Sequence, residues 1–311
     1  MKENKVVMAG AGVMGASLAQ VYALAGYDTY VYDIYEAGLE KGKHLISINQ
    51  EMMVKEGLIT AEESKAALAR MTFTLDKECF RDCCLVVEST VERMDIKQNF
   101  FAEISEIAPA EALLATNTSG LKITEIAKAC KHPERFMGQH WLNPPHLLPL
   151  CEIIAGEQTS PENVQKMRKL VEGLGKQPVV VADINGFIIN RIKFAVLREA
   201  LHIVDIGAAS IEDVDTVLKA GMGLRYAALG PFGVADFGGL DTFDHINSYL
   251  NAELDDSKVG NKRLHEMVQA GKLGVKSGQG FYDYSGDKAD EAIRERDRLY
   301  IELAKVLYFK K

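Results

Sequence analysis

Residues 6–15 read Val-Val-Met-Ala-Gly-Ala-Gly-Val-Met-Gly, and this stretch decides the fold. A short apolar run, typical of a buried strand, leads straight into a GxGxxG turn, and the chain then continues with helical character to Gly26. Free backbone N–H groups and the dipole at the start of such a helix attract a phosphate. The stretch therefore predicts a strand, a tight turn and a helix that together bind an anionic group.

A second predicted strand, residues 29–32, ends in Asp33, eighteen residues after Gly15. A carboxylate at the tip of that strand accepts hydrogen bonds from both hydroxyls of an adenosine ribose, and it repels the additional phosphate of NADP. The alternative is an ordinary glycine turn before a helix, since GxGxxG also occurs by chance. The strand, the helix and the acid in register favour NAD as the cofactor. Its predicted contacts here are Gly10, Gly12, Val13, Met14, Gly15 and Asp33.

Composition excludes several classes of protein. The chain has 311 residues, 47% of them hydrophobic and 26% charged, as in a soluble globular protein long enough for two domains. A net charge of −8 without a long run of like charges argues against nucleic acid and anionic membranes as partners. No apolar run could span a membrane, and the N-terminus leaves no room for a targeting peptide, so we expect a cytoplasmic protein. The five irregularly spaced cysteines predict neither a disulfide framework nor a metal site.

Strand and helix signals alternate from Lys5 to about Asp183. This alternation predicts a Rossmann-type α/β fold, a doubly wound and mainly parallel sheet with helices on both faces. The further strands are expected at 71–74, 84–88, 113–116, 135–140, 150–155 and 177–182, and the helices after Asp33 at 35–56, 60–70, 96–108, 123–127 and 161–174. Thr60 and Glu63 have the spacing of a capping box at the start of one of these helices.

The character of the chain changes near residues 184–186, after which no convincing strand follows. Helices are expected at 187–206, 211–220, 240–250, 262–270 and 287–308, with Ser210 as an N-cap. We therefore predict two domains: a Rossmann domain that binds NAD at residues 1–184, and an all-helical domain at residues 185–311.

Glu152 interrupts an apolar strand, where an unpaired carboxylate is costly. Twelve residues earlier, His140 ends the preceding predicted strand. Two neighbouring strands joined by a turn can bring these side chains together. A buried carboxylate that holds one imidazole nitrogen leaves the other as a base, which the oxidation of an alcohol to a ketone requires. The alternative is a purely structural His–Glu pair.

Asn190 and the polar segment 115–120 are two further candidates for ligand contact. Asn190 lies in helical register with Phe194, Leu197 and Leu201, a stripe that we expect to be buried, so its amide could face a ligand cleft. The alternative is an amide that satisfies the backbone at a helix end. Residues 115–120 place small polar side chains, Ser119 among them, at the carboxyl end of a predicted parallel strand, where open α/β sheets bind ligands. A polar loop that caps the next helix is the alternative.

The chain resembles the 3-hydroxyacyl-CoA dehydrogenase family over nearly its whole length. The motifs that carry the resemblance stand in order: GAGVMG at Gly10, ESTVERMDIKQNFF at Glu88, ATNTSGL at Ala115, GQHWLNPP at Gly138, PLCEII at Pro149, NGFIINRI at Asn185, LGPFGVADFGGLDT at Leu229 and GVKSGQGFYDY at Gly274. Together and in register they are highly specific. The resemblance implies a Rossmann domain and a helical domain that mediates substrate binding and dimerisation, so we expect a homodimer.

The resemblance also implies roles for individual residues. His140 matches the family's catalytic base, and Glu152 the carboxylate that orients it. Ser119 and Asn190 match the residues that contact the substrate, the reduced nicotinamide or the histidine. Further contacts to the dinucleotide are implied for Glu92, Lys97, Ser119, Asn143 and Lys276.

Some segments depart from the acyl-CoA members of the family. Trp141-Leu142 replaces the two phenylalanines common after the base, and the serine and lysine that hold CoA fall nearest to Asn49 and Lys55. Residues 223–226, Gly-Leu-Arg-Tyr, resemble relatives that oxidise free hydroxy acids, the gulonate dehydrogenase (λ-crystallin) and carnitine dehydrogenase branches. Arg225 could then pair with a substrate carboxylate. A surface or interface salt bridge is the alternative for this arginine.

We therefore expect an NAD-dependent dehydrogenase that oxidises the 3-hydroxyl of a short-chain L-3-hydroxyacyl-CoA, such as 3-hydroxybutyryl-CoA, or that runs the reverse reduction. Lys55 is the candidate contact for the CoA ester. The alternative substrate is a free 3-hydroxy acid of the gulonate or carnitine kind, with Arg225 as its contact. An alternative of another class is a non-catalytic NAD-binding structural protein, against which the intact set His140, Glu152, Ser119 and Asn190 argues.

Overall fold

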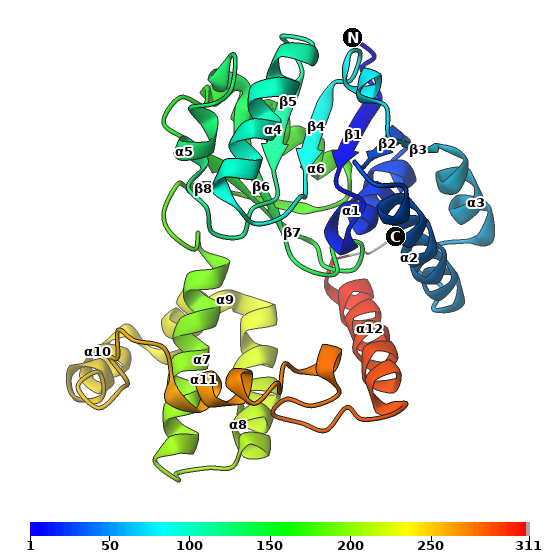
Figure 1. The fold of residues 1–311 in the computed structure, drawn as a ribbon. Helices are drawn as coiled ribbons and strands as arrows, with labels where there is room; N and C mark the ends of the chain where they lie inside the picture. The colour runs from blue at the N-terminus through cyan, green and yellow to red at the C-terminus, as the bar shows by residue number, and fades with distance from the viewer. Residues whose placement is uncertain (309–311) are drawn as a thin grey trace. The chain divides into compact units, whose positions relative to one another are not determined.

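A computed structural model describes residues 1–308 of the chain (Figure 1). The chain forms two compact units. The first comprises Met1–Asn190 together with the segment from Asp297 onward, and the second comprises Arg191–Arg296. In residues 1–308, no helix combines the length and the apolar character needed to cross a membrane.

The first unit is built on an eight-stranded sheet with the strand order β3-β2-β1-β4-β5-β6-β7-β8. Neighbouring strands are parallel except β6 and β7, which pair antiparallel. The predicted Rossmann-type, mainly parallel sheet is therefore confirmed. The strands are β1 (Lys5–Ala9), β2 (Asp28–Tyr32), β3 (Met71–Thr74), β4 (Leu85–Glu88), β5 (Leu113–Thr116), β6 (Phe136–Trp141), β7 (Leu150–Ala155) and β8 (Gln177–Ala182).

Helices cover both faces of this sheet, as Figure 1 shows. Alternate side chains of β1 enter two different apolar clusters, because successive residues of a strand point to opposite faces. One cluster packs against α1, α2 and α6, and the other against α4 and α5. The helices of the first unit are α1 (Val13–Leu24), α2 (Glu36–Lys55), α3 (Ala61–Ala69), α4 (Met94–Ile107), α5 (Ile123–Ala127) and α6 (Pro161–Gly173), with short 3₁₀ turns η1 (Lys77–Phe80) and η2 (Pro133–Arg135).

Local capping explains where one of these helices begins. Thr60 accepts a hydrogen bond from the backbone N–H of Glu63, and the Glu63 carboxylate accepts one from the Thr60 backbone. The two bonds satisfy two N–H groups that a helix start otherwise leaves free. The predicted capping box is confirmed.

The second unit is helical, as predicted. Residues 191–296 contain only isolated β-bridges, which join Gly274, Gln279 and Asp283. Ser210 caps its helix by accepting from the backbone of Asp213, also as predicted. The elements are α7 (Ile189–Asp205), which begins in the first unit, α8 (Ile211–Val217), the π-helical η3 (Leu218–Gly223), α9 (Leu224–Gly238), α10 (Leu240–Leu250), α11 (Lys262–Gln269), η4 (Val275–Ser277) and the first part of α12 (Lys288–Leu307).

Two expectations about the second unit are corrected. Residues 224–238 form α9, although the sequence analysis placed no helix there. Glycine and proline usually disfavour a helix, and this segment contains several glycines and Pro231. The helix is nevertheless interrupted only at Gly230, whose φ is 71°, and Pro231 begins the helical segment that follows. The stripe beside Asn190 is not buried throughout, because Phe194 is 58% exposed while Leu201 is buried. Periodicity shows which residues share a face, but not what covers that face.

The glycine turn offers a sharp test of the packing around β1 and α1. A Cβ added to Gly15 would lie 1.8 Å from the backbone oxygen of Gly10, whereas a Cβ at Gly12 would meet no atom within 4 Å. Gly15→Ala should therefore lower the free energy of unfolding by about 1–3 kcal/mol or more. Gly12→Ala should leave it unchanged. Thermal unfolding without cofactor measures both, and equal melting temperatures for the two variants would contradict the packing described.

The same pair of variants tests what the open space at Gly12 is for. A ligand that binds only the folded state raises the melting temperature. Excess NAD should do so for the unmodified protein and much less for Gly12→Ala, because the added methyl group points into the space predicted for the pyrophosphate. An equal rise for both proteins would show that the pyrophosphate lies elsewhere.

Candidate active site

The antiparallel hairpin of β6 and β7 places His140 directly opposite Glu152. The His140 Nδ1 atom lies 2.7 Å from Glu152 Oε2. The side chains are only 4% and 2% exposed, so solvent hardly screens this contact. The structure thus brings together the two residues that the sequence analysis paired.

The second oxygen of Glu152 is held by the start of α7. Glu152 Oε1 accepts hydrogen bonds from the backbone N–H groups of Ile188 and Ile189, each at 3.0 Å. Burial alone would raise the pKa of the Glu152 carboxyl, but the hydrogen bonds from His140 and from these two N–H groups outweigh it and lower the pKa. An ionised Glu152 can only accept, so Nδ1 of His140 carries the proton and Nε2 is left as the basic nitrogen.

Ser119 and Asn190 also meet in the first unit. The Asn190 side-chain amide donates to the backbone oxygen of Ser119 at 2.8 Å. Glu92 accepts from the backbone N–H of Ser119 at 2.9 Å and from the Thr118 hydroxyl at 2.6 Å. The loop after β5 is therefore held from two sides, and Ser119 itself is exposed.

A buried ion pair lies beneath this loop. Lys97, which is 1% exposed, places its Nζ atom 2.7 Å and 3.0 Å from the oxygens of the fully buried Glu88. Glu88 also accepts from the Thr116 hydroxyl at 2.6 Å, and Lys97 lies 3.5 Å from Glu92. These contacts connect the end of β4, the end of β5 and the exposed Glu92 in one network.

The residues of the glycine turn fit a dinucleotide. A Cβ at Gly12 would project into open space, so the backbone can approach a bound pyrophosphate closely. Asp33 follows β2, and its two oxygens accept from the backbone N–H groups of Ala11 at 2.8 Å and Tyr35 at 3.0 Å. These bonds fix the predicted ribose acid beside the phosphate turn. Val13 and Met14 open α1 directly after this turn.

The other residues predicted to contact the cofactor or the substrate lie on several different elements of both units. Asn143, at the start of the loop after β6, and Lys55, the last residue of α2, are exposed. Asn49 is only 8% exposed. Arg225 in α9 and Lys276 in η4 belong to the second unit, and both are exposed.

Sequence reasoning missed two contributors to this region, Phe187 and the backbone of residues 188 and 189, and it missed the role of a third, Asn117, within the loop 115–120 that it singled out. The ring of Phe187 lies 5.4 Å from the His140 ring, the backbone of residues 188 and 189 holds Glu152, and Asn117 accepts from the Trp141 backbone at 2.9 Å. Every residue except proline has a backbone N–H, so the sequence does not show which of these groups bind a carboxylate. Gly186-Phe187 before a helix was the one available signal, since a glycine there permits a tight turn.

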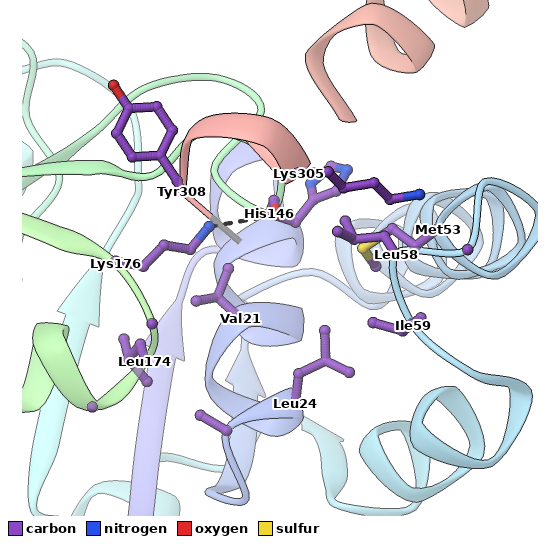
Figure 2. A pocket seen from close by; sticks show the side chains of 14 residues that line it. Val21, Leu24, Met53, Leu58, Ile59, His146, Leu174, Lys176, Lys305 and Tyr308 are labelled. Atoms are coloured by element: carbon purple, nitrogen blue, oxygen red, sulfur yellow. Dashed lines mark hydrogen bonds between the residues drawn. The ribbon is translucent and has the colours of Figure 1, made fainter. Parts of the chain in front are cut away.

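The first unit also has a pocket of about 820 Å³, separate from the dinucleotide turn. Figure 2 shows side chains that line it. It is lined by the C-terminal half of α1, which is the end remote from Gly12, and by the end of α2. Burial lowers the pKa of Lys176, at its edge, to about 7. The Lys176 ammonium donates to the backbone oxygens of Pro145 at 2.8 Å and Leu148 at 3.0 Å, so it holds the loop between β6 and β7.

Comparison with known proteins places both parts of the chain. Residues 5–184 match the family model of the 3-hydroxyacyl-CoA dehydrogenase NAD binding domain, and residues 186–284 match that of its C-terminal domain. A probable 3-hydroxybutyryl-CoA dehydrogenase of Deinococcus radiodurans is 41% identical over 276 residues, which cover 88% of this chain and 98% of the relative. A 5-formyl-3-hydroxy-2-methylpyridine 4-carboxylate 5-dehydrogenase of Mesorhizobium japonicum is 33% identical over 306 residues, or 98% of both chains.

Solved structures give the same picture. A 5-formyl-3-hydroxy-2-methylpyridine 4-carboxylic acid 5-dehydrogenase, described as an NAD⁺-dependent dismutase, matches with a TM-score of 0.91 at 32% identity over 100% of both chains. The (S)-3-hydroxybutyryl-CoA dehydrogenase of Ralstonia eutropha matches with a TM-score of 0.75 at 33% identity, over 92% of this chain and all of the other. The two-part fold, the glycine turn and these matches show that the chain belongs to the 3-hydroxyacyl-CoA dehydrogenase family, whose members are NAD-dependent oxidoreductases.

Proposed function

We propose that the protein interconverts a hydroxyl and a carbonyl group with NAD, and that His140 is the general base. The observation that carries this proposal is the buried His140–Glu152 pair, whose carboxylate is also held by two backbone N–H groups. Burying two charged groups costs free energy of hydration, so apolar residues of similar size would fill the same space without loss of stability. Packing alone therefore does not account for a His–Glu pair at this position. A purely structural NAD-binding protein would not require it.

In the proposed oxidation, Nε2 of His140 takes the proton of the substrate hydroxyl. Glu152 keeps its negative charge, accepts from Nδ1 and stabilises the positive imidazole. Ser119 and Asn190, tied to each other by a hydrogen bond, hold the reacting oxygen and the geometry around the base. Bound NAD supplies the acceptor for the hydride.

The proposed cofactor contacts follow the geometry of the first unit. Asp33 receives the adenosine ribose, and the N-terminus of α1 receives the pyrophosphate. Glu92, at the end of the buried ion-pair network, lies beside Ser119, where the nicotinamide half is proposed to bind. The full proposed set is Gly10, Gly12, Val13, Met14, Gly15, Asp33, Glu92, Lys97, Ser119, Asn143 and Lys276.

The first candidate substrate is a short-chain L-3-hydroxyacyl-CoA, which would be oxidised at its 3-hydroxyl. Relatives named 3-hydroxybutyryl-CoA dehydrogenase, at 37% and 41% identity, support it. The adenosine diphosphate end of CoA requires cations. Two exposed lysines of α2 are the proposed contacts: Lys55, and Lys43 about 18 Å along the helix, which also pairs with Glu40.

A second candidate is a small free carboxylate, such as a hydroxy acid. The specific observation in its favour is that the pyridine-carboxylate dehydrogenases match more of this chain, over 98% of its sequence and with a TM-score of 0.91. The 3-hydroxybutyryl-CoA dehydrogenases of Deinococcus radiodurans and Ralstonia eutropha match 88% of its sequence and give a TM-score of 0.75, respectively. Arg225 is the proposed partner of the carboxylate, because a guanidinium pairs with it through two hydrogen bonds.

The second unit supports the proposal of a homodimer. Phe232 and Phe237 are 86% and 84% exposed, and among residues 191–296 only Leu201 is buried. Large exposed aromatic side chains on one unit mark an interaction surface. We propose that these exposed side chains of α9 pack against a second copy of the chain.

Replacement of the base is the direct test of the mechanism. His140→Gln should lower kcat by about a hundred- to ten-thousandfold while the affinity for NADH stays unchanged. Glu152→Gln should also lower kcat, because an amide does not stabilise the positive imidazole. NADH absorbance follows the reaction, and fluorescence titration gives the affinity. Near-normal turnover of His140→Gln with the best substrate would refute the assignment.

The lowered pKa of Glu152 predicts how stability depends on pH. A carboxyl whose pKa is lower in the folded than in the unfolded chain stabilises the fold above the unfolded value, which is usually about 4.5, and loses this contribution as the pH falls through the folded value. Glu152→Gln should thus be less stable than the unmodified protein by about 2 kcal/mol at pH 7. The gap should narrow on acidification below pH 4.5. Urea unfolding at several pH values measures it, and a gap that does not change with pH would count against an ionised Glu152.

Two variants separate the candidate substrates. If the substrate is a CoA ester, neutralising Lys43 and Lys55 together should raise the KM for acetoacetyl-CoA and leave kcat nearly unchanged, since these contacts lie far from the reacting carbon. If it is a free acid, Arg225→Met should raise KM about thirtyfold, as expected for the loss of about 2 kcal/mol from a charged pair. The panel should include gulonate, carnitine and 3-hydroxybutyrate. Activity with one of these acids that exceeds acetoacetyl-CoA reduction and is lost in Arg225→Met would overturn the first candidate.

Light scattering tests the dimer. At micromolar concentration, the measured mass should be twice the 34.3 kDa of one chain. Replacing Phe232 and Phe237 by Asp should shift it toward one chain, because the charges cannot be buried unpaired. A single-chain mass for the unmodified protein would refute the proposal.

A further inference from the structure

Phe187 has an unusual backbone conformation for its type. Its φ is +50°, in the left-handed region, and its side chain is fully buried. A bulky residue rarely adopts this conformation, which costs about 1–3 kcal/mol and persists only where the surroundings enforce it. Such residues cluster at functional sites.

The left-handed backbone has a consequence for Glu152. Gly186, with φ of 76°, and Phe187 form a tight turn in which the Phe187 N–H donates to the backbone oxygen of Ile184 at 3.1 Å. The next two N–H groups, of Ile188 and Ile189, both point at Glu152 Oε1. These are among the first N–H groups of a helix, which have no partner within the helix itself. The turn at Phe187 therefore brings the free end of α7 onto the carboxylate.

The side chain of Phe187 has a consequence for His140. The two rings lie 5.4 Å apart with an angle of 56° between their planes. Phe187 also belongs to the apolar cluster that contains Phe136 and Ile154 of strands β6 and β7. Its ring thus lies beside the imidazole and belongs to the same apolar cluster as residues of the two strands that carry His140 and Glu152.

We propose that Phe187 is a positioning residue for the His140–Glu152 pair, with its backbone directing two N–H groups at Glu152 and its ring packing beside His140. The inference rests on the proposed function, in which His140 is the base. Phe187 acts through the pair, because its contacts are with the two members of the pair and with the core. Its ring and its backbone make separate contributions, which different substitutions can separate.

Phe187→Leu removes the ring and keeps an unbranched Cβ. Phe187→Val also places a β-branched residue at positive φ, which is a strong conformational conflict. Phe136 provides the matched control, because it is fully buried in the same apolar cluster and lies at the other end of the His140 strand. Leu and Val are both acceptable there, since β-branched residues suit an extended strand.

Two readouts are measured in all four variants. The first is kcat and KM for acetoacetyl-CoA with NADH, together with the affinity for NADH. The second needs no substrate: it is the proton resonance of His140 Nδ1–H, identified by its absence in His140→Gln. A hydrogen bond to a carboxylate moves this resonance downfield, so its position reports the geometry of the pair.

We expect kcat to fall about tenfold in Phe187→Leu and about a hundredfold in Phe187→Val, because small displacements of a catalytic group have large effects on rate. The Nδ1–H resonance should shift upfield or disappear in Phe187→Val. The affinity for NADH should stay within twofold. Both Phe136 variants should lose stability but keep the resonance and kcat.

The proposal is overturned if Phe187→Val retains the resonance of the unmodified protein, or if kcat of each Phe187 variant lies within twofold of its Phe136 counterpart. Should Phe187→Val fail to fold, the kcat and resonance of Phe187→Leu decide by the same comparison. His140→Gln, measured in parallel, separates the two hypotheses. If it keeps its turnover, the proposed function fails. If it loses turnover while the Phe187 variants behave as the controls do, only the positioning role fails.

Discussion

The first unit is organised around one buried carboxylate. Glu152 lies within an apolar strand and meets three donors: the imidazole of His140 and two backbone N–H groups at the start of α7. An ionised carboxylate without such partners could not remain in that position, because the loss of hydration would dominate. The antiparallel pairing of β6 with β7 is what sets His140 opposite it. In a parallel pair, hydrogen bonds slant and the connection is long, so a direct cross-strand contact from a short loop would not arise.

A second set of buried charges supports the neighbouring loop. The Glu88 carboxylate accepts from both the Lys97 ammonium and the Thr116 hydroxyl, so the ends of β4 and β5 are fixed relative to each other. Glu92, at the protein surface, accepts a hydrogen bond from the backbone N–H of Ser119, and the backbone oxygen of Ser119 accepts one from the Asn190 amide. Burial of such a pair gives little net stability, but it allows few alternative arrangements. The polar groups proposed to meet the substrate are thus held by a network and not by isolated contacts.

Family membership leaves the substrate open for a physical reason. The fold is shared by enzymes whose names refer to a CoA ester and to a pyridine carboxylate. Specificity depends on the groups that bind the remainder of the substrate, and those proposed above are exposed lysines on α2 or an arginine on α9. Exposed cations can serve many anions. In the proposed reaction, the hydride step is the same for both candidate substrates, so the groups that bind the rest of the molecule decide between them.

Much of this protein follows from its sequence alone. The strand and helix pattern, the glycine turn, the acid after β2, the capping box at Thr60 and the pairing of His140 with Glu152 are all readable, because they depend on local periodicity and on the high energy of a buried charge. Tertiary structure decided the rest. The left-handed turn at Phe187, the backbone donors of residues 188 and 189 and the burial of Lys97 depend on which segments meet. Neither the helix α9 nor the exposure of Phe194 could be predicted from the sequence pattern. Helix-breaking residues and hydrophobic periodicity describe one segment, and they do not show which surface packs against it.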